Sequence, residues 1–193
     1  TIDGPSASGK GSLSRNIAKH LGFKILDSGL LYRTYAYFSQ SGPNIEEISI
    51  RIKNEISLSF NENDVSILHK DKDITSLLRS ETTAKIASEL SALPQTREDL
   101  LTIQRDFYNQ EGLVADGRDM GTVVFPKAAL KIFLTASPEV RAKRRHLELQ
   151  KRGQEVNMLD LIADIELRDM KDRTRTLSPL IPAEDSVVID SSN

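Results

Sequence analysis

The first fifteen residues, TIDGPSASGKGSLSR, restrict the possible folds of this chain more than any other stretch. An apolar strand end runs into a turn of small residues, and apolar residues then recur at helical spacing from Leu13 to Leu21. In such a strand–turn–helix unit, the backbone N–H groups of the turn and the positive helix end bind anions such as phosphate. The stretch therefore predicts an α/β fold in which a turn between Gly4 and Gly9 cradles phosphates and Lys10 reaches the outer ones.

The residue after the lysine departs from the usual phosphate-loop pattern. That pattern has Ser or Thr directly after the lysine, whereas this chain has Gly11 and delays the hydroxyl to Ser12. A glycine-rich turn with a surface lysine is the alternative interpretation. The position of the turn between a strand and an amphipathic helix favours the phosphate loop, because the motif requires that context.

Composition narrows the class of protein. The chain has 193 residues, of which 38% are hydrophobic and 28% charged, so it can build the core of one compact domain. Its net charge of -2 argues against a general binder of nucleic acid polymers. No apolar run approaches a membrane span, and the lack of cysteine fits a reducing compartment, so we expect a cytoplasmic protein without a membrane partner. Because the chain starts inside an apparent strand and lacks an initiator Met, we expect further residues before Thr1.

Strands and helices alternate along most of the chain, which is typical of a parallel sheet. The region from residue 45 to residue 92 interrupts this order, since residues 56–60 and 65–70 alternate like the strands of a hairpin. Pro94 then predicts the start of a helix. The predicted core strands are the opening stub and residues 23–27, 113–116, 130–135 and 187–190.

Two aspartates lie at the ends of predicted strands, where ligands gather in an open parallel sheet. Asp116 ends a hydrophobic strand, as a magnesium-associated carboxylate does in phosphate-loop enzymes, and we expect it to act on the metal through water. For Asp27, a helix cap and a functional role remain equally open.

A set of arginines lies near predicted strand ends or helix termini. Arg168, Asp172 and Arg175 follow one another at i, i+4 and i+7, so a helix would place them on one face. The alternative is a solvated helix with ordinary ion pairs. The whole set is Arg33, Arg97, Arg118, Arg168 and Arg175.

Five stretches together resemble the bacterial cytidylate kinases, which are nucleoside-monophosphate (NMP) kinases: GPSASGKGS, LDSGLLYR, ADGRDMGTVVFP, KIFLTAS and RDMKDRTR. They follow the family's order and cover nearly the whole chain, including its long middle insertion. The resemblance implies a P-loop NTPase-type α/β fold, with a five-stranded parallel sheet flanked by helices, an NMP-binding insertion and a lid. It divides the chain into a P-loop core (1–35, 93–143 and 158–193), the insertion (36–92) and the lid (144–157).

The resemblance also implies a reaction and the residues that perform it. ATP would transfer its γ-phosphoryl group to CMP or dCMP, giving ADP and CDP or dCDP, with Mg2+ as cofactor. The catalytic residues would be Lys10, Arg118 and Arg175. The ATP-binding residues would be Gly4, Pro5, Ser6, Ala7, Ser8, Gly9, Lys10, Gly11, Ser12, Arg144, Arg145 and Arg152. The residues that bind the acceptor nucleotide would be Ser28, Tyr32, Arg33, Ser88, Arg97, Arg118, Asp119, Arg168, Asp172 and Arg175.

The implied roles agree with the chemistry of cytosine. Ser88, Arg97 and Asp119 would contact the base: an aspartate accepts from the N4 amino group, and an arginine donates to O2 and N3. UMP presents an acceptor at C4 and a donor at N3, so it would meet mismatched groups. The sugar contacts would fall on Arg168 and Asp172. The acceptor-phosphate contacts would fall on Arg33, Arg118 and Arg175.

The implied mechanism needs no general base, because the acceptor phosphate is already largely ionised. A glycine after the lysine is part of the resemblance, and it offers no hydroxyl to magnesium. We therefore expect the ATP phosphates and waters to hold the ion, with Ser12 near the α-phosphate. The resemblance suggests a monomer whose lid arginines close over ATP and expel water.

Two rival functions remain open at this point. A phosphate-loop kinase for a non-nucleotide acceptor would need fewer phosphate-binding arginines and usually a base near a hydroxyl. A non-catalytic NTP-binding module would hydrolyse ATP slowly without depending on an acceptor.

Overall fold

The predicted parallel strands form one five-stranded sheet in the order β2-β6-β1-β7-β8. β1 pairs in parallel with β6 and β7, and β7 pairs in parallel with β8. This confirms the predicted α/β class and the position of each core strand. The bounds are β1 (Ile2–Asp3), β2 (Lys24–Asp27), β6 (Leu113–Gly117), β7 (Ile132–Thr135) and β8 (Val187–Asp190).

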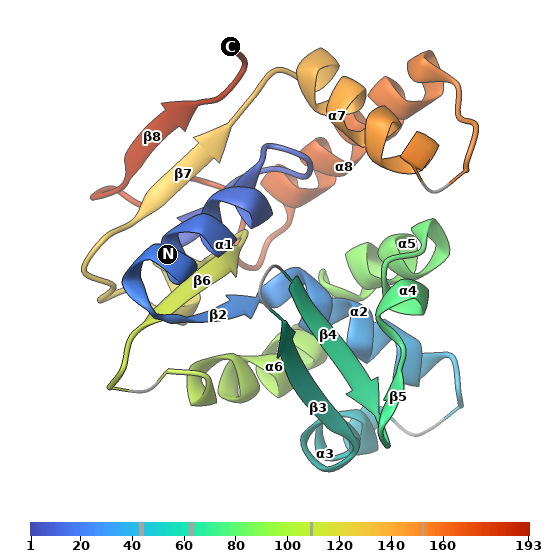
Figure 1. Cartoon of the computed structure of the whole chain (residues 1–193), viewed down its shortest axis with the longest axis vertical. Coiled ribbons are helices and arrows are strands. Elements are labelled where there is room, and N and C mark those ends of the chain that lie inside the picture. Colours follow the sequence, from blue (N-terminus) through green and yellow to red (C-terminus); the bar gives the residue numbers. More distant parts are fainter. Residues whose placement is uncertain (43–44, 62–63, 109, 152) are drawn as a thin grey trace. The chain divides into compact units, whose positions relative to one another are not determined.

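The structure is a computed structural model, drawn in Figure 1. It describes residues 1–42, 45–61, 64–108, 110–151 and 153–193. Its contacts divide the chain into two units, of which the first comprises Thr1–Ile17 and Val114–Asn193 and the second Ala18–Leu113. The division into core, insertion and lid is a functional one, and it stays a prediction.

The first unit carries the phosphate loop and the last two helices. α1 (Lys10–Leu21) begins directly after the loop and ends at Gly22, whose φ of 69° is that of a C-terminal cap, as predicted. α7 (Pro138–Lys151) and α8 (Met158–Thr174) pack against each other. Between β6 and β7 lies a π-helical turn, η1 (Met120–Val124), which the sequence pattern did not predict.

The second unit is built around α2 (Ser28–Ser39), which packs against all the other long helices of the unit. The predicted hairpin is confirmed as antiparallel β3 (Ile56–Asn61) and β4 (Asp64–His69), and the short β5 (Lys72–Asp73) extends it. One buried hydrophobic cluster of the unit comprises Leu30, Ile67, Ile74 and Leu78. Pro94 opens α6, as predicted. The remaining helices are α3 (Ile45–Glu55), α4 (Thr75–Leu78), α5 (Glu81–Leu90) and α6 (Pro94–Asp106).

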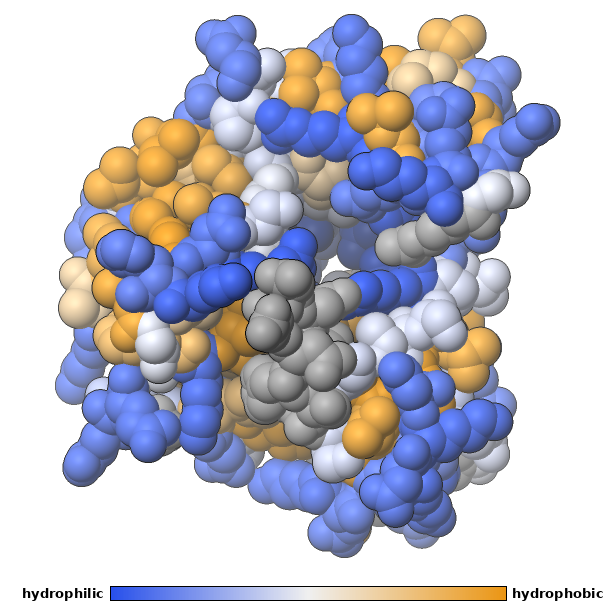
Figure 2. All heavy atoms as spheres, in the orientation of Figure 1, coloured by the Kyte–Doolittle hydropathy of each residue, from blue (hydrophilic) through white to orange (hydrophobic). Residues whose placement is uncertain are grey.

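The edge strand β8 has an apolar, exposed surface. Val187 and Val188 expose more than half of their surface, 52% and 58%. Figure 2 shows hydrophobic side chains gathered over β7 and β8. Among the described residues, no helix is long and apolar enough to cross a membrane.

Candidate active site

The phosphate loop between β1 and α1 has a backbone that only small residues can follow. Gly4 has a φ of 146°, and a Cβ there would lie 2.0 Å from the carbonyl oxygen of Leu134. Ala7 has a φ of 58°, in the left-handed region that non-glycine residues seldom adopt. The loop therefore has the irregular, tight form that a backbone anion site requires.

Two arginines of α7 hold this loop by its carbonyl groups. Arg141 donates to the oxygen of Ser6 at 3.3 Å, and Arg144 donates to the oxygen of Ser8 at 3.2 Å. A trans peptide unit directs its N–H opposite to its C=O. The N–H groups that follow Ser6 and Ser8 therefore point away from the arginines, and are available to phosphate oxygens. Lys10 is buried, and its Nζ donates to the oxygen of Pro5 at 2.8 Å, so its charge lies at the loop.

The support beneath the loop includes a buried ion pair that the sequence pattern did not indicate. Arg141 is 2% exposed and pairs through both terminal nitrogens with Asp169 of α8, and its Nε donates to the oxygen of Ala136 at 2.9 Å. A buried guanidinium with all these partners holds a fixed position. α7, α8 and the phosphate loop are therefore tied together at Arg141.

Asp116 lies close to the start of α1. The residue is 8% exposed, and one carboxylate oxygen lies 3.5 Å from the position that a Cβ on Gly11 would take. The guanidinium of Arg15 lies 3.4 Å from the same position. A Cβ at residue 11 would therefore make ordinary van der Waals contact with both groups, and Asp116 and Arg15 both lie beside Gly11.

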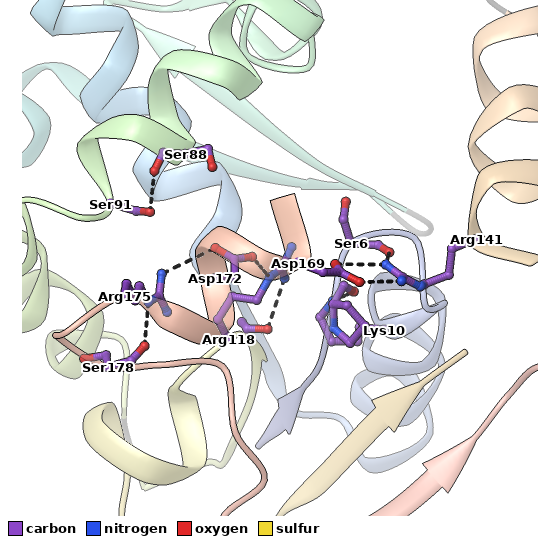
Figure 3. A network of polar contacts seen from close by, with 12 residues as sticks. Ser6, Lys10, Ser88, Ser91, Arg118, Arg141, Asp169, Asp172, Arg175 and Ser178 are labelled. Carbon is purple, nitrogen blue, oxygen red and sulfur yellow. Dashed lines mark hydrogen bonds and ion pairs between the residues drawn. The ribbon is translucent and has the colours of Figure 1, made fainter. Parts of the chain in front are cut away.

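A cluster of charged residues comes together around Asp172 of α8. Figure 3 shows Arg118 and Arg175 both directed at this carboxylate. Arg118 Nε donates to it at 3.2 Å, and Arg175 Nη1 lies 3.7 Å from its other oxygen. Asp172 and Arg175 are almost fully buried, with side chains only 8% and 7% exposed. Asp172 and Arg175, two of the three residues on the predicted face, thus form an ion-pair cluster with Arg118 and are not part of a solvated helix surface.

Two further predicted residues, Asp119 and Arg168, lie next to this cluster in the sequence or on α8. Asp119 follows Arg118, is 3% exposed, and accepts backbone hydrogen bonds from Val123 and Val124 through its carbonyl oxygen. Arg168 lies half-buried on α8, one turn before Asp172.

Asp3 lies beside the predicted site residues, and the sequence interpretation did not single it out. It ends β1 immediately before Gly4 and is 5% exposed. Its two carboxylate oxygens accept from the N–H groups of Met120 at 2.8 Å and Gly121 at 2.7 Å. Burial raises the pKa of Asp3, while these two hydrogen bonds oppose the rise. Asp3 therefore fastens the turn that carries Arg118 and Asp119 to the strand that leads into the phosphate loop.

We expect Asp3→Asn to lower kcat by about 10²-fold, because a displacement of the catalytic groups by about 1 Å has that effect. The amide of asparagine keeps one oxygen to accept from one of the two backbone N–H groups. It turns its own N–H group toward the other, so that two donors face each other. Stability should change little, since ionised Asp3 destabilises the fold above its raised pKa and the amide removes that cost. Steady-state kinetics and thermal melting of Asp3→Asn check this, with Asp185→Asn as the control, because Asp185 bonds Lys131 instead of the loop. Unchanged kcat in Asp3→Asn would contradict the role.

The second unit holds the other predicted acceptor residues. Ser28 is the first residue of α2, and its Oγ accepts from Gln104 Nε2 at 2.8 Å. The guanidinium carbon of Arg97 lies 5.7 Å from the centre of the Tyr32 ring, over its face. Arg97 also donates to the oxygen of Ser91 at 3.0 Å. Ser28 and Tyr32 of α2 and Arg97 of α6 therefore lie where these two helices contact each other.

The remaining predicted residues have their own positions in the structure. Arg33 donates to the carbonyl oxygens of Leu78 at 2.8 Å and Ser80 at 3.2 Å, and Ser88 lies half-buried on α5. Asp27 acts as a helix cap, since its side chain accepts from Leu30 N at 3.1 Å.

The predicted lid arginines do not share one environment. Arg144 lies at the phosphate loop and donates to Ser8, and it also contacts Ser191. Arg145 pairs with Glu148 one turn along α7 at 2.8 Å. Arg152 lies outside the described residues. The role of each in binding ATP stays a prediction.

Comparison with known proteins agrees with this architecture. The family model described as cytidylate kinase matches residues 1–193. The cytidylate kinase of a Marinomonas strain is 46% identical over 200 residues, which covers 100% of this chain and 88% of that protein. Those of Photobacterium profundum and Shewanella oneidensis are 46% and 44% identical, and each alignment covers 100% of this chain and 87% of the relative.

Proposed function

This chain belongs to the cytidylate kinase family, and from that premise we propose that it transfers the γ-phosphoryl group of ATP to CMP and dCMP. The products are ADP and CDP or dCDP. One observation carries the proposal beyond family membership: the compact unit that holds the phosphate loop also holds two arginines fixed on Asp172. Arginine binds phosphate through two parallel hydrogen bonds, so this cluster suits a second phosphate group beside that of ATP.

The donor half of the reaction belongs to residues 4–12. The loop from Gly4 to Gly9 binds the ATP phosphates through its N–H groups, Ser12 approaches the α-phosphate, and Lys10 neutralises charge on the transferred group. The lid at residues 144–157 closes over ATP and excludes water, which would otherwise accept the phosphoryl group.

Magnesium fits the residues present, though loosely. Among the described residues, no cluster of three or more His, Asp or Glu side chains could hold a metal by itself. Asp116 offers one carboxylate close to the start of α1, and carboxylate, phosphate and water oxygens are the ligands that Mg2+ prefers. When bound, the ion neutralises charge on the ATP phosphates. Asp116 would hold it through water.

The acceptor half belongs to three groups of side chains. Arg33, Arg118 and Arg175 bind the phosphate of CMP. Asp172 accepts from a ribose hydroxyl with the help of Arg168; a carboxylate has about four lone-pair sites, so it can hold its arginines at the same time. The cytosine base is read by Ser88, Arg97 and Asp119.

No general base is part of this proposal. The acceptor phosphate is a nucleophile that carries its charge already, so positioning and charge neutralisation provide the catalysis. A monomer fits the chemistry, because the groups needed for both substrates belong to one chain. A location in the cytoplasm fits the lack of cysteine.

A panel of acceptors tests the proposal: CMP, dCMP, UMP, AMP and no acceptor, each with ATP and magnesium, followed by ADP formation. We expect turnover with CMP and dCMP, at least about tenfold less with UMP, and almost none without an acceptor. ADP formation that does not depend on an acceptor would indicate a hydrolysing NTP-binding module. Activity on a small hydroxylated acceptor in place of CMP would indicate a non-nucleotide kinase.

The same panel with Asp119→Asn tests base recognition. The amide of this variant can present a donor where the aspartate presents only acceptors, so it loses the ionic acceptor for N4 and can donate to the O4 of UMP. We expect kcat/KM for CMP to fall by about 10²-fold and the preference for CMP over UMP to shrink. A preserved CMP-to-UMP ratio would contradict the assignment of Asp119.

A further inference from the structure

Several polar contacts connect α2 with α6 in the second unit. Two of them involve residues in the first turns of α2, Ser28 and Tyr32. Ser28 and Tyr32 are four residues apart on α2, and Arg97 and Gln104 are seven apart on α6, so each pair shares one face. Arg97 lies over the ring of Tyr32, and Gln104 bonds Ser28. The first contact joins two residues of the proposed acceptor site. The second brings in Gln104, to which no role has been given.

The Gln104–Ser28 hydrogen bond is short and shielded from solvent. Gln104 Nε2 lies 2.8 Å from Ser28 Oγ, and the two residues are 2% and 3% exposed. A serine hydroxyl has one hydrogen to donate and two lone pairs that accept. Because the amide nitrogen is a donor only, Ser28 Oγ accepts in this contact. Its own hydrogen is left to be donated to another group.

We propose that Gln104 is a positioning residue that fixes the Ser28 hydroxyl as a hydrogen-bond donor to the acceptor phosphate of CMP. This inference rests on the proposed function, and on the expectation from the sequence that Ser28 is one of the acceptor-binding residues. Phosphate oxygens only accept hydrogen bonds, so a hydroxyl held with its hydrogen outward is matched to them. Ser28 lies in the first turn of α2, at the positive end of the helix, which also favours an anion there.

Two substitutions of Gln104 separate this role from simple core packing. Gln104→Met removes the amide donor and keeps a flexible chain of similar length, so the hydroxyl is free to rotate. Gln104→Glu keeps the shape but presents a carboxylate, which accepts the Ser28 hydrogen and also repels the phosphate. If Gln104 served only to pack the core, Gln104→Glu would weaken the binding of CMP no more than the binding of ATP.

The experiment measures the dissociation constants of CMP and ATP by calorimetry, with thermal melting of each variant. We expect Gln104→Met to weaken CMP binding by about fivefold, the loss typical of one neutral hydrogen bond, and Gln104→Glu by more than about tenfold. ATP binding should be unchanged in both. Gln95→Met is the control, because Gln95 lies exposed on the same helix, where it bonds Asp99, and it should leave CMP binding unaltered.

The decisive step repeats Gln104→Met in a Ser28→Ala background. We expect Ser28→Ala to weaken CMP binding by about tenfold, and the second substitution to add nothing, since Gln104 acts through the missing hydroxyl. A further fivefold loss in the double variant would overturn the inference, as would unchanged CMP binding in Ser28→Ala. Failure of the proposed function is recognised separately, because the unsubstituted protein would then show no CMP-dependent ADP formation.

Discussion

Replacing Lys10 by methionine should lower kcat by about 10²–10³-fold, the usual effect of removing one group that stabilises transition-state charge. Lys10 is 6% exposed, and its ammonium is held against the oxygen of Pro5, at the loop that binds the ATP phosphates. Methionine keeps the apolar stem and removes the ammonium, with its charge and its hydrogen bond to Pro5. The expected loss is therefore one of turnover, with the fold intact.

Steady-state kinetics at saturating ATP and CMP measure this effect. Lys143→Met is the matched control, because Lys143 is an exposed lysine on α7. We expect the control to keep the kcat of the unsubstituted protein. A Lys10→Met variant with undiminished kcat would show that the loop lysine does not act on the transferred group.

Removing either arginine that pairs with Asp172 should impair the use of CMP severely. We expect Arg118→Ala and Arg175→Ala each to lower kcat/KM for CMP by about 10²-fold or more, because each removes a positive charge that neutralises the acceptor phosphate. Each change also leaves the almost fully buried Asp172 with one ion-pair partner fewer. The KM for ATP should change much less.

The control for this pair is Arg173→Ala, since Arg173 lies on α8 beside Asp172 but is exposed. It should behave like the unsubstituted protein. Comparing KM with kcat then separates lost binding from lost transition-state stabilisation. Normal kinetics in both Arg118→Ala and Arg175→Ala would refute the acceptor-phosphate assignment.

The elements that depend on local chemistry were predictable from the sequence. Gly22 ends α1 because its left-handed conformation suits a cap, and Pro94 begins α6 because its missing N–H is not needed there. Alternation in residues 56–60 and 65–70 predicted the hairpin that β3 and β4 form. In these cases the signal lies within a few residues of the structure that it specifies.

Elements held by distant partners were not predictable in this way. The turn η1 begins where Asp3, more than a hundred residues earlier in the chain, accepts from Met120 and Gly121. Local propensity gives no indication of such a bond. β5 has only two residues, which is too short for any alternation to be seen.

In the candidate site too, features set by local spacing were predictable from the sequence, and contacts with distant segments were not. The predicted face of Arg168, Asp172 and Arg175 follows from helical spacing, but the arrival of Arg118 from another segment does not. Gln104 escaped notice as a single amide among charged neighbours, although its spacing of seven from Arg97 was a usable signal. Arg141 looked like one member of a basic run, because only the fold reveals that Asp169 lies opposite it.

Following the phosphoryl group itself tests the central claim most directly. The protein is incubated with magnesium, CMP and ATP labelled in its γ-phosphate, and the products are separated by chromatography. The proposed transfer predicts that the label appears in the β-phosphate of CDP, in an amount equal to the ADP formed. Label recovered as inorganic phosphate, at the same rate with and without CMP, would contradict it.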